Sequence, residues 1–345
     1  MQLIEVNNTD FKHDIEVLYC FPDHNSSCRK EVRTGTGNIL LFIFLSCISV
    51  CTVILNLLVI ISISHFKQLH TPTNLLILSL AVADLLMGMF VMPVDIMQLI
   101  DSCWYLGKLS CCILDLINCL SVTASLCSLT FIAVDRYIAV CDPLLYSTRV
   151  TVCKTSLIII LGWSFAVFYI IIICYFNNHL LPSQLSSNCY GECVMVMKYS
   201  WLIVDLVVSF LTPCSVIIVT YLIIFKVARR QAKAVRAVKN GAGNNRGPQS
   251  SSSSETKAAK KIGTVIFVFI AFWIPFYLGS FSVDNFTSVS IVWTVFGWLL
   301  EINSSVNPLI YAIFYSWFRT SCKFIVTCRI FRHSSSRFNL FPDHF

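Results

Sequence analysis

Seven apolar runs, each long enough to cross a bilayer, constrain this chain more than any other feature. They cover residues 38–64, 73–98, 108–138, 153–176, 200–228, 259–283 and 290–314. A bilayer core needs about 20 mostly apolar residues per helix, and hydrocarbon excludes an open sheet, whose backbone groups would lack partners. The composition agrees, because 56% hydrophobic and 12% charged residues leave more apolar surface than a soluble fold can bury. We predict an all-α membrane protein, a seven-transmembrane helix bundle over 38–314 with a short amphipathic eighth helix over about 316–328.

Basic residues set the predicted orientation. They gather in 229–258, which we interpret as a flexible third inner loop, and in the tail 315–345. The positive-inside rule places both in the cytosol, so residues 1–37 lie outside the cell, where the sequons at Asn7 and Asn25 agree with them. The first helix must itself direct the chain to the plasma membrane, because 1–36 contain no apolar run. The net charge of +7 indicates membrane lipid as a partner rather than nucleic acid.

Polar residues at bilayer depth require partners, because a charge there costs about 2.5–3.5 kcal/mol on insertion scales. Asp84 lies in the middle of the second run, and Ser125 and Asn303 lie at similar depth in others. These residues predict a buried hydrogen-bond network and, compatibly, a candidate sodium site. No other metal site or cofactor is expected, because paired His and Cys at zinc spacing are missing.

The inner end of the third run carries Asp135-Arg136-Tyr137, and Glu255 begins the sixth run on the same side. An Arg136–Glu255 pair would be a latch that opens when the helices separate. The alternative is that Asp135 alone satisfies Arg136.

Four prolines lie inside predicted spans, at Pro93, Pro213, Pro275 and Pro308. Each removes a backbone hydrogen bond and kinks its helix. We therefore expect a bundle that flexes and opens a cavity at one end.

Taken together, these residues resemble the rhodopsin-like class of G-protein-coupled receptors. The matching motifs are Asn56, Leu80–Asp84, Asp135–Tyr137, Trp163, Pro213 with Tyr221, Phe269-x-x-x-Trp273-x-Pro275 and Asn307–Tyr311. The segments His65–Asn74, Asn303–Phe318 and Phe331–Phe341 look similar to the trace amine-associated receptors in particular. A biogenic-amine receptor is the alternative.

The resemblance implies two disulfides, Cys28–Cys189 and Cys111–Cys193, with Cys20 as a rival for Cys189. It also implies an anchor for the ligand ammonium, which most aminergic receptors place on the third helix, eighteen residues before the Arg of the Asp-Arg-Tyr motif. In this chain that position is Asn118. The usual carboxylate is absent.

Other acids face the same region. Asp205 on the fifth run is the expected anchor, as in some fish trace amine receptors that lack the third-helix Asp; the alternative is an acid facing the headgroups. Glu301 on the seventh run is the second anchor, unless it makes an internal hydrogen bond or stays neutral. The full set of expected ligand contacts is Asp205, Glu301, Asp115, Asn118, Trp273, Phe276, Tyr277 and Trp298, with Asp95 and Asp284 near the opening. Two separated acids favour a diamine or polyamine, because each ammonium leaving water needs an opposite charge or an aromatic face.

These expectations describe an amine receptor, with an olfactory role implied by the family. The resemblance further implies a heterotrimeric G protein of the stimulatory or olfactory type and rising cAMP. Activation would pass through Trp273 and Phe269 to Arg136, Tyr221, Asn307, Pro308 and Tyr311. A non-amine ligand that bonds Asn118 is another alternative. A transporter is disfavoured because no inverted repeat is visible, and an enzyme because no HExxH or nucleophile–base set appears. Cys322 or Cys328 is a candidate palmitoylation site.

Overall fold

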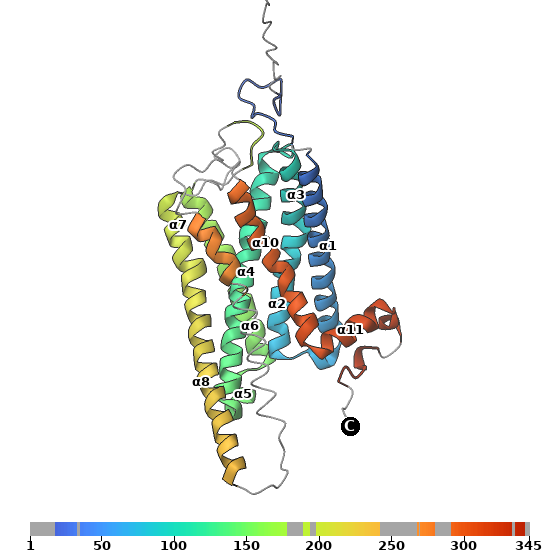
Figure 1. Ribbon diagram of the computed structural model, residues 1–345, viewed down its shortest axis with the longest axis vertical. Coiled ribbons are helices and arrows are strands. Elements are labelled where there is room, and N and C mark those ends of the chain that lie inside the picture. The colour runs from blue at the N-terminus through green and yellow to red at the C-terminus, as the bar shows by residue number, and fades with distance from the viewer. Residues whose placement is uncertain are drawn as a thin grey trace, which may run out of the picture.

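The computed structural model describes residues 18–32, 35–177, 189–193, 198–241, 268, 270–279, 291–332 and 335–341. The described chain is a bundle of long helices, with α11 lying across the end opposite to residues 18–32 (Figure 1). The helices that form the bundle are α1 (Thr36–His65), α2 (Pro72–Leu86), α3 (Met92–Ile100), α4 (Gly107–Cys141), α6 (Val152–Asn177), α7 (Tyr199–Asp205), α8 (Thr212–Gly241) and α10 (Ile291–Phe314). Ile270–Gly279 is a shorter apolar helix. Each predicted span therefore corresponds to helix in the described residues.

Shorter elements connect and extend the bundle. They are η1 (Lys67–Leu69), the π-helices η2 (Met87–Val91) and η4 (Leu206–Leu211), α5 (Pro143–Arg149), α11 (Ser316–Val326), η5 (Arg329–Phe331) and η6 (Ser335–Arg337). Five described helices are long and apolar enough to cross a membrane. They run over Thr36–His65, Pro72–Ile100, Gly107–Cys141, Val152–Asn177 and Tyr199–Gln231.

Two of the predicted proline kinks take the form of π-turns. Pro93 and Pro213 each stand second in the α-helix that follows η2 or η4. Because proline has no N–H to donate, the preceding backbone opens into a wider turn, which is a common form of π-bulge. The turns keep α2 with α3, and α7 with α8, as continuous spans.

One predicted boundary is wrong. The expected flexible loop at 229–258 begins inside α8, which stays helical to Gly241. The segment after Ala228 is rich in Ala, Arg, Lys and Gln, all strong helix formers, so the helix continues past the apolar run. Residues 242–258 lie outside the described part of the chain.

Helix α4 lies at the centre and packs against α2, α6 and α8. Polar contacts fix three of these helices together: the Trp163 indole N–H donates to the Ser79 hydroxyl over 3.0 Å, and Ser79 lies 2.9 Å from the Ser128 hydroxyl. The apolar core on this side includes Leu80 and Leu129. α11 is amphipathic as predicted, with Trp317, Phe318 and Phe324 buried while Arg319 is exposed.

Candidate functional site

Asp205, at the end of α7, points into the bundle and is held by two tyrosines. The Tyr169 hydroxyl on α6 donates to one carboxylate oxygen over 2.9 Å, and the Tyr277 hydroxyl donates to the other over 3.0 Å. Both tyrosines are buried, whereas Asp205 is half-buried. Two hydroxyl donors stabilise a carboxylate and still leave lone pairs for a further donor. Asp205 is thus a fixed negative group and not one that faces the headgroups.

Aromatic rings form the base of this acid site. Tyr277 lies 4.9 Å from Phe210, 5.4 Å from Phe276 and 5.9 Å from Trp273, measured between ring centres. Phe210 and Trp273 also stack, at 5.9 Å. Of the predicted aromatic walls, Trp273, Phe276 and Tyr277 therefore gather beside Asp205.

Trp298 lies elsewhere. It packs with Leu45 of α1, Met87 and Val91 of η2, and Ile96 of α3, and no ring contact joins it to the Tyr277 cluster among the described residues. Trp298 therefore lies apart from the other three candidate walls, and its contact with a ligand stays a prediction.

Glu301 and Asp95 form a second acid group, across α10 and α3. Their carboxyl groups lie within the range of charge interaction, and Glu301 is 7% exposed. The Glu301 Oε2 atom has no hydrogen-bond partner among the described residues. The sequence placed Asp95 only near the opening, so this pairing was not foreseen.

Asp115 and Asn118 lie on α4, and both are half-buried. Asp115 lies within the range of charge interaction of Asp95, and Cys119 lies within that range of both Asp115 and Asp205. The α4 segment from Asp115 to Cys119 therefore runs between the Asp205 site and the Asp95–Glu301 pair.

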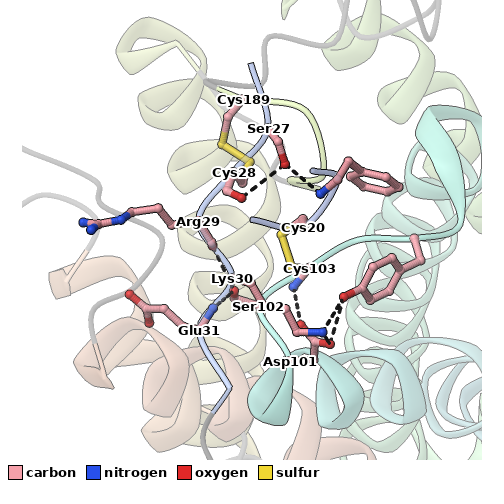
Figure 2. The surroundings of a disulfide bond; sticks show 12 residues. Cys20, Ser27, Cys28, Arg29, Lys30, Glu31, Asp101, Ser102, Cys103 and Cys189 are labelled. Carbon is pink, nitrogen blue, oxygen red and sulfur yellow. Dashed lines mark hydrogen bonds and ion pairs between the residues drawn. A yellow bond between two sulfur atoms is a disulfide. The ribbon is translucent and has the colours of Figure 1, made fainter. Parts of the chain in front are cut away.

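A covalently fixed cap covers the same end of the bundle. We define it as residues 18–32, 101–105 and 189–193. Figure 2 shows two of its disulfides, Cys28–Cys189 and Cys20–Cys103, and the third is Cys111–Cys193. The two predicted bonds are present, and Cys20 is not a rival for Cys189 because it pairs with Cys103.

The Cys20–Cys103 bond was missed because the two residues are 83 positions apart and no motif joins them. Backbone contacts bring them together: Cys20 N–H donates to Cys28 O over 2.9 Å, and Trp104 N–H donates to Gly191 O over 2.8 Å. Gly191 has a φ of +101°, and a Cβ there would lie 3.0 Å from Cys20 Cβ. Glycine is therefore required at this crossing.

An ion pair also holds the cap. Lys30 Nζ lies 3.0 Å from Asp101 Oδ2, and the Tyr105 hydroxyl donates to the same oxygen over 3.0 Å (Figure 2 draws the contacts). Burial opposes ionisation of Asp101, but hydrogen bonds from Lys30, the Cys103 N–H and Tyr105 outweigh it, and the pKa of Asp101 is lowered. The hydrogen bond with Tyr105, and then that with Asp101, raises the pKa of Lys30. Nearby, Asn25 is exposed, whereas Asn7 lies outside the described residues.

Asp84 is the centre of a buried polar network at mid-bundle. Ser125 donates to one of its oxygens over 3.1 Å and Asn307 to the other over 2.8 Å, while Asp84 is 1% exposed. Asn303 is buried one turn before Asn307 on α10. A carboxylate and a hydroxyl at bilayer depth are oxygen ligands of the kind that hard cations take. The residues thus fit a sodium ion.

Arg136 is satisfied at the opposite end from the cap. Its Nε donates to Asp135 Oδ2 over 3.0 Å, and its terminal amine also donates to the Thr73 hydroxyl. Tyr146, on α5, donates to the other Asp135 oxygen over 2.8 Å. Tyr146 was missed because it lies between two predicted membrane spans, although Asp142-Pro143 is an ordinary helix start.

The structure describes few contacts for several other residues that were predicted to take part in activation. Tyr137 and Tyr221 are half-buried, and the Tyr221 hydroxyl has no partner among the described residues. Pro308 lies inside α10. Tyr311 is helical, but its side chain is not described; Glu255, Phe269 and Asp284 lie outside the described residues. The Arg136–Glu255 latch therefore stays a prediction.

Comparison with known proteins decides the family. Residues 55–311 match the 7 transmembrane receptor (rhodopsin family) model. Trace amine-associated receptor 13c of Danio rerio is 40% identical over 331 residues, covering 94% of this chain and 96% of that protein. Trace amine-associated receptor 6 of Pan troglodytes is 37% identical, covering 96% and 97%, and trace amine-associated receptor 4 of Rattus norvegicus is 34% identical, covering 98% and 100%.

The chain belongs to the trace amine-associated receptors, in the rhodopsin family. It is a receptor and not an enzyme, and a multi-pass plasma-membrane protein. As a receptor of this family it has seven transmembrane helices, which agrees with the bundle. The acids at Asp205 and Asp95–Glu301, the network at Asp84 and the contacts of Arg136 lie in this order from the capped end of the receptor toward the other.

Proposed function

We propose that this receptor binds amines at Asp205, prefers ligands with two or more amino groups, and signals through a stimulatory or olfactory G protein to raise cAMP. The observation that carries the proposal is the fixation of the Asp205 carboxylate by Tyr169 and Tyr277 over 2.9 and 3.0 Å. The names of the relatives, which refer to trace amines, support the ligand class. An olfactory role is part of the proposal.

Charge explains why Asp205 is the anchor. An ammonium entering the bundle needs an opposite charge, and at an effective dielectric near 20 a carboxylate about 4 Å away offers about 4 kcal/mol before desolvation. Asn118, at the usual anchor position, offers only a neutral amide. The ring cluster of Trp273, Phe276 and Tyr277 supplies aromatic faces for the rest of the cation.

The second acid group supports a preference for more than one amine. Glu301 and Asp95 lie on α10 and α3, away from the α6–α7 side that holds Asp205. A ligand whose second ammonium reaches Glu301 would join the two sides of the bundle. A monoamine can satisfy only one of them.

Activation is proposed as a shift between two populations. A ligand held by Asp205 also contacts Tyr277, which lies 5.9 Å from Trp273. A change at Trp273 would favour the outward position of the helix that contains it, and Arg136 would leave Asp135 to open a groove for a G-protein helix. A sodium ion held by Asp84 and Ser125 with Asn303 would oppose this rearrangement.

The capped end is proposed to face outside the cell. Disulfides form and persist in oxidising surroundings, and three of them lie at that end. Asn25 is exposed there for glycosylation, and Asn7 would share that side. The exposed Cys328, just past α11, is the better of the two candidate palmitoylation sites, because Cys322 is half-buried.

A ligand screen tests the proposal. Monoamines, diamines and linear polyamines are applied to cells that express the receptor, and the readouts are cAMP and dissociation biosensors for each G-protein class. We expect amines to raise cAMP, and Asp205→Ala to abolish the response at equal surface expression. A response to biogenic monoamines alone would favour the neurotransmitter-receptor alternative. A response only to neutral ligands would favour binding at Asn118.

A further inference from the structure

The chain after α11 folds back against the turn between α1 and α2. We call residues 335–341, which make this contact, the docked tail. Leu340 is 1% exposed and belongs to the same apolar cluster as Phe66 and Leu69. Its N–H donates to the Gln68 side-chain oxygen over 3.1 Å. The docked tail is therefore held at η1 by an apolar contact and a hydrogen bond.

Aromatic rings join the docked tail to α11 as well. Phe338 lies 4.7 Å from Phe324, measured between ring centres, and Phe324 lies 5.6 Å from Phe66. Phe324 and Phe66 are both buried. One row of rings thus connects the tail, α11 and the end of α1.

Ser335 is the polar centre of this contact. Its side chain is 9% exposed, and its hydroxyl donates to the Ile330 carbonyl over 2.7 Å and lies 2.9 Å from His65 Nε2. A carbonyl oxygen can only accept, so the single hydroxyl proton points to Ile330 and His65 donates from Nε2. The docked state therefore needs both the proton of Ser335 and a free lone pair on its oxygen.

Basic residues lie on both sides of Ser335 in the sequence. Arg332 stands three residues before it and Arg337 two residues after it, and both are exposed. The stretch 329–341 contains no Asp or Glu. Protein kinases select their substrates partly by such charge patterns, and this one fits a kinase with acids around its substrate groove.

A phosphate on Ser335 is incompatible with the docked tail. It would bring a charge of about −1.5 to −2 and three acceptor oxygens to a site that now holds one hydroxyl. The ester oxygen has no proton, so the Ile330 carbonyl would lose its donor and face negative oxygens instead. Charge and hydrogen bonding both oppose docking once the phosphate is present.

We propose that Ser335 is a phosphorylation site for a kinase that recognises basic residues, and that phosphorylation releases the docked tail from the turn between α1 and α2. In the reaction the Ser335 oxygen forms a bond to the terminal phosphorus of ATP, the bond from that phosphorus to ADP breaks, and the hydroxyl proton passes to the kinase and then to water. The inference goes beyond the proposed function. It uses only the proposed orientation, which places the tail in the cytosol with ATP.

The first test locates the phosphate. The purified receptor in lipid nanodiscs is incubated with Mg²⁺, ATP and a kinase that prefers basic substrates, and mass spectrometry identifies the modified residue. We expect Ser335, and we expect Arg332→Ala to slow the reaction by about tenfold or more, the effect of one lost charged hydrogen bond. Arg329→Ala, which removes another exposed arginine, is the matched control. Phosphate on Ser336 alone, or no phosphate, overturns the inference.

The second test measures docking by hydrogen exchange of the peptide that contains 335–341. Phosphorylation should speed exchange of the Leu340 N–H by about tenfold or more, because a buried acceptor loses its donor. Coupling is reciprocal, so Leu340→Ala, which weakens docking, should speed phosphorylation. Phe341→Ala changes an exposed neighbour and should not. Unchanged exchange after full phosphorylation overturns the release, and slower exchange does so too, because the phosphate would then bind His65 and tighten the tail.

Labelling of a C-terminal epitope in cells separates this inference from the orientation. Labelling only after permeabilisation supports a cytosolic tail, and absence of phosphate from Ser335 in those cells then overturns the inference alone. Labelling of intact cells refutes the orientation and overturns the inference with it. The amine screen gives an independent result, since none of these measurements uses a ligand.

Discussion

The two acid sites of this receptor are built from the same kind of residue and behave differently. Asp205 is bonded by two tyrosine hydroxyls, at 2.9 and 3.0 Å, whereas Glu301 lies near another carboxyl group, that of Asp95. A hydroxyl group donates a hydrogen bond to a carboxylate, whereas a second carboxyl group places a like charge beside it. The partners of an acid, and not its presence alone, therefore decide what a ligand meets at each site. Four predictions test this difference.

Removal of the fixed charge should have the largest effect. In Asp205→Asn the amide cannot neutralise an ammonium, and a loss of about 3 kcal/mol, within the range for hydrogen bonds to charged groups, lowers potency by about 100-fold for monoamines and diamines alike. The measurement is the concentration–response curve in a G-protein biosensor, normalised to surface expression. An unchanged half-maximal concentration would show that Asp205 is no anchor.

The tyrosine donors should matter next. Tyr169→Phe and Tyr277→Phe each keep the ring and remove one hydrogen bond to a charged carboxylate, worth about 1.5–3 kcal/mol, so potency should fall by about tenfold or more. Tyr175→Phe, which changes an exposed tyrosine of the same helix as Tyr169, is the matched control. If all three variants have the same potency, the hydroxyl groups of Tyr169 and Tyr277 do not support the anchor and only their rings contribute.

Asp115 should affect one class of ligand only. Asp115→Asn removes a carboxyl group near Asp95, which weakens the attraction for a second ammonium by about threefold if the screened interaction is about 0.6 kcal/mol. The potency of monoamines held at Asp205 should stay the same. An equal loss for both classes would mean that one acid site extends across α4, and the comparison between two sites would fail.

The smallest effect is expected in the cap. The pKa of Asp101 is lowered, so the stabilisation from its pair with Lys30 is present above the ordinary range of an aspartate, about 3.9, and is lost only as the pH falls through the lower folded value. The pair therefore does not titrate between pH values near 6 and 8, and Lys30→Ala should leave the pH dependence of the response in this range unchanged. A changed pH dependence would show that the ion pair in the cap, and not the acids inside the bundle, titrates in this range.

Much of the fold was predictable because lipid imposes simple rules. The first four membrane spans begin and end within a few residues of the apolar runs, as for Thr36–His65 against 38–64. The exception is α8. Hydropathy predicts where the helix leaves the membrane, but it does not predict where the helix ends, because Ala, Arg and Lys favour helix beyond the membrane as well. A search for long apolar runs does not find short helices such as α5, because they do not cross the membrane.

The site was predictable in its parts and not in its contacts. Asp205, Glu301 and Tyr277 were all expected, since acids and aromatics at bilayer depth are costly or unusual. Tyr169 was missed because no sequence motif distinguishes it from the other tyrosines of the apolar helices. Asp95 was assigned only to the opening, because its closeness to Glu301 depends on how α3 and α10 cross.

The sequence by itself determined that the chain is a helical membrane receptor, that its usual anchor position is Asn118, and which acids remain inside. These features follow from local composition and spacing, because each transmembrane helix must by itself be long and apolar enough to cross the bilayer. Only the tertiary structure decided which acid meets which partner, and that Cys20 bonds Cys103 across 83 positions. Those outcomes depend on the rotation and depth of neighbouring helices, which are set by packing between residues far apart in the chain.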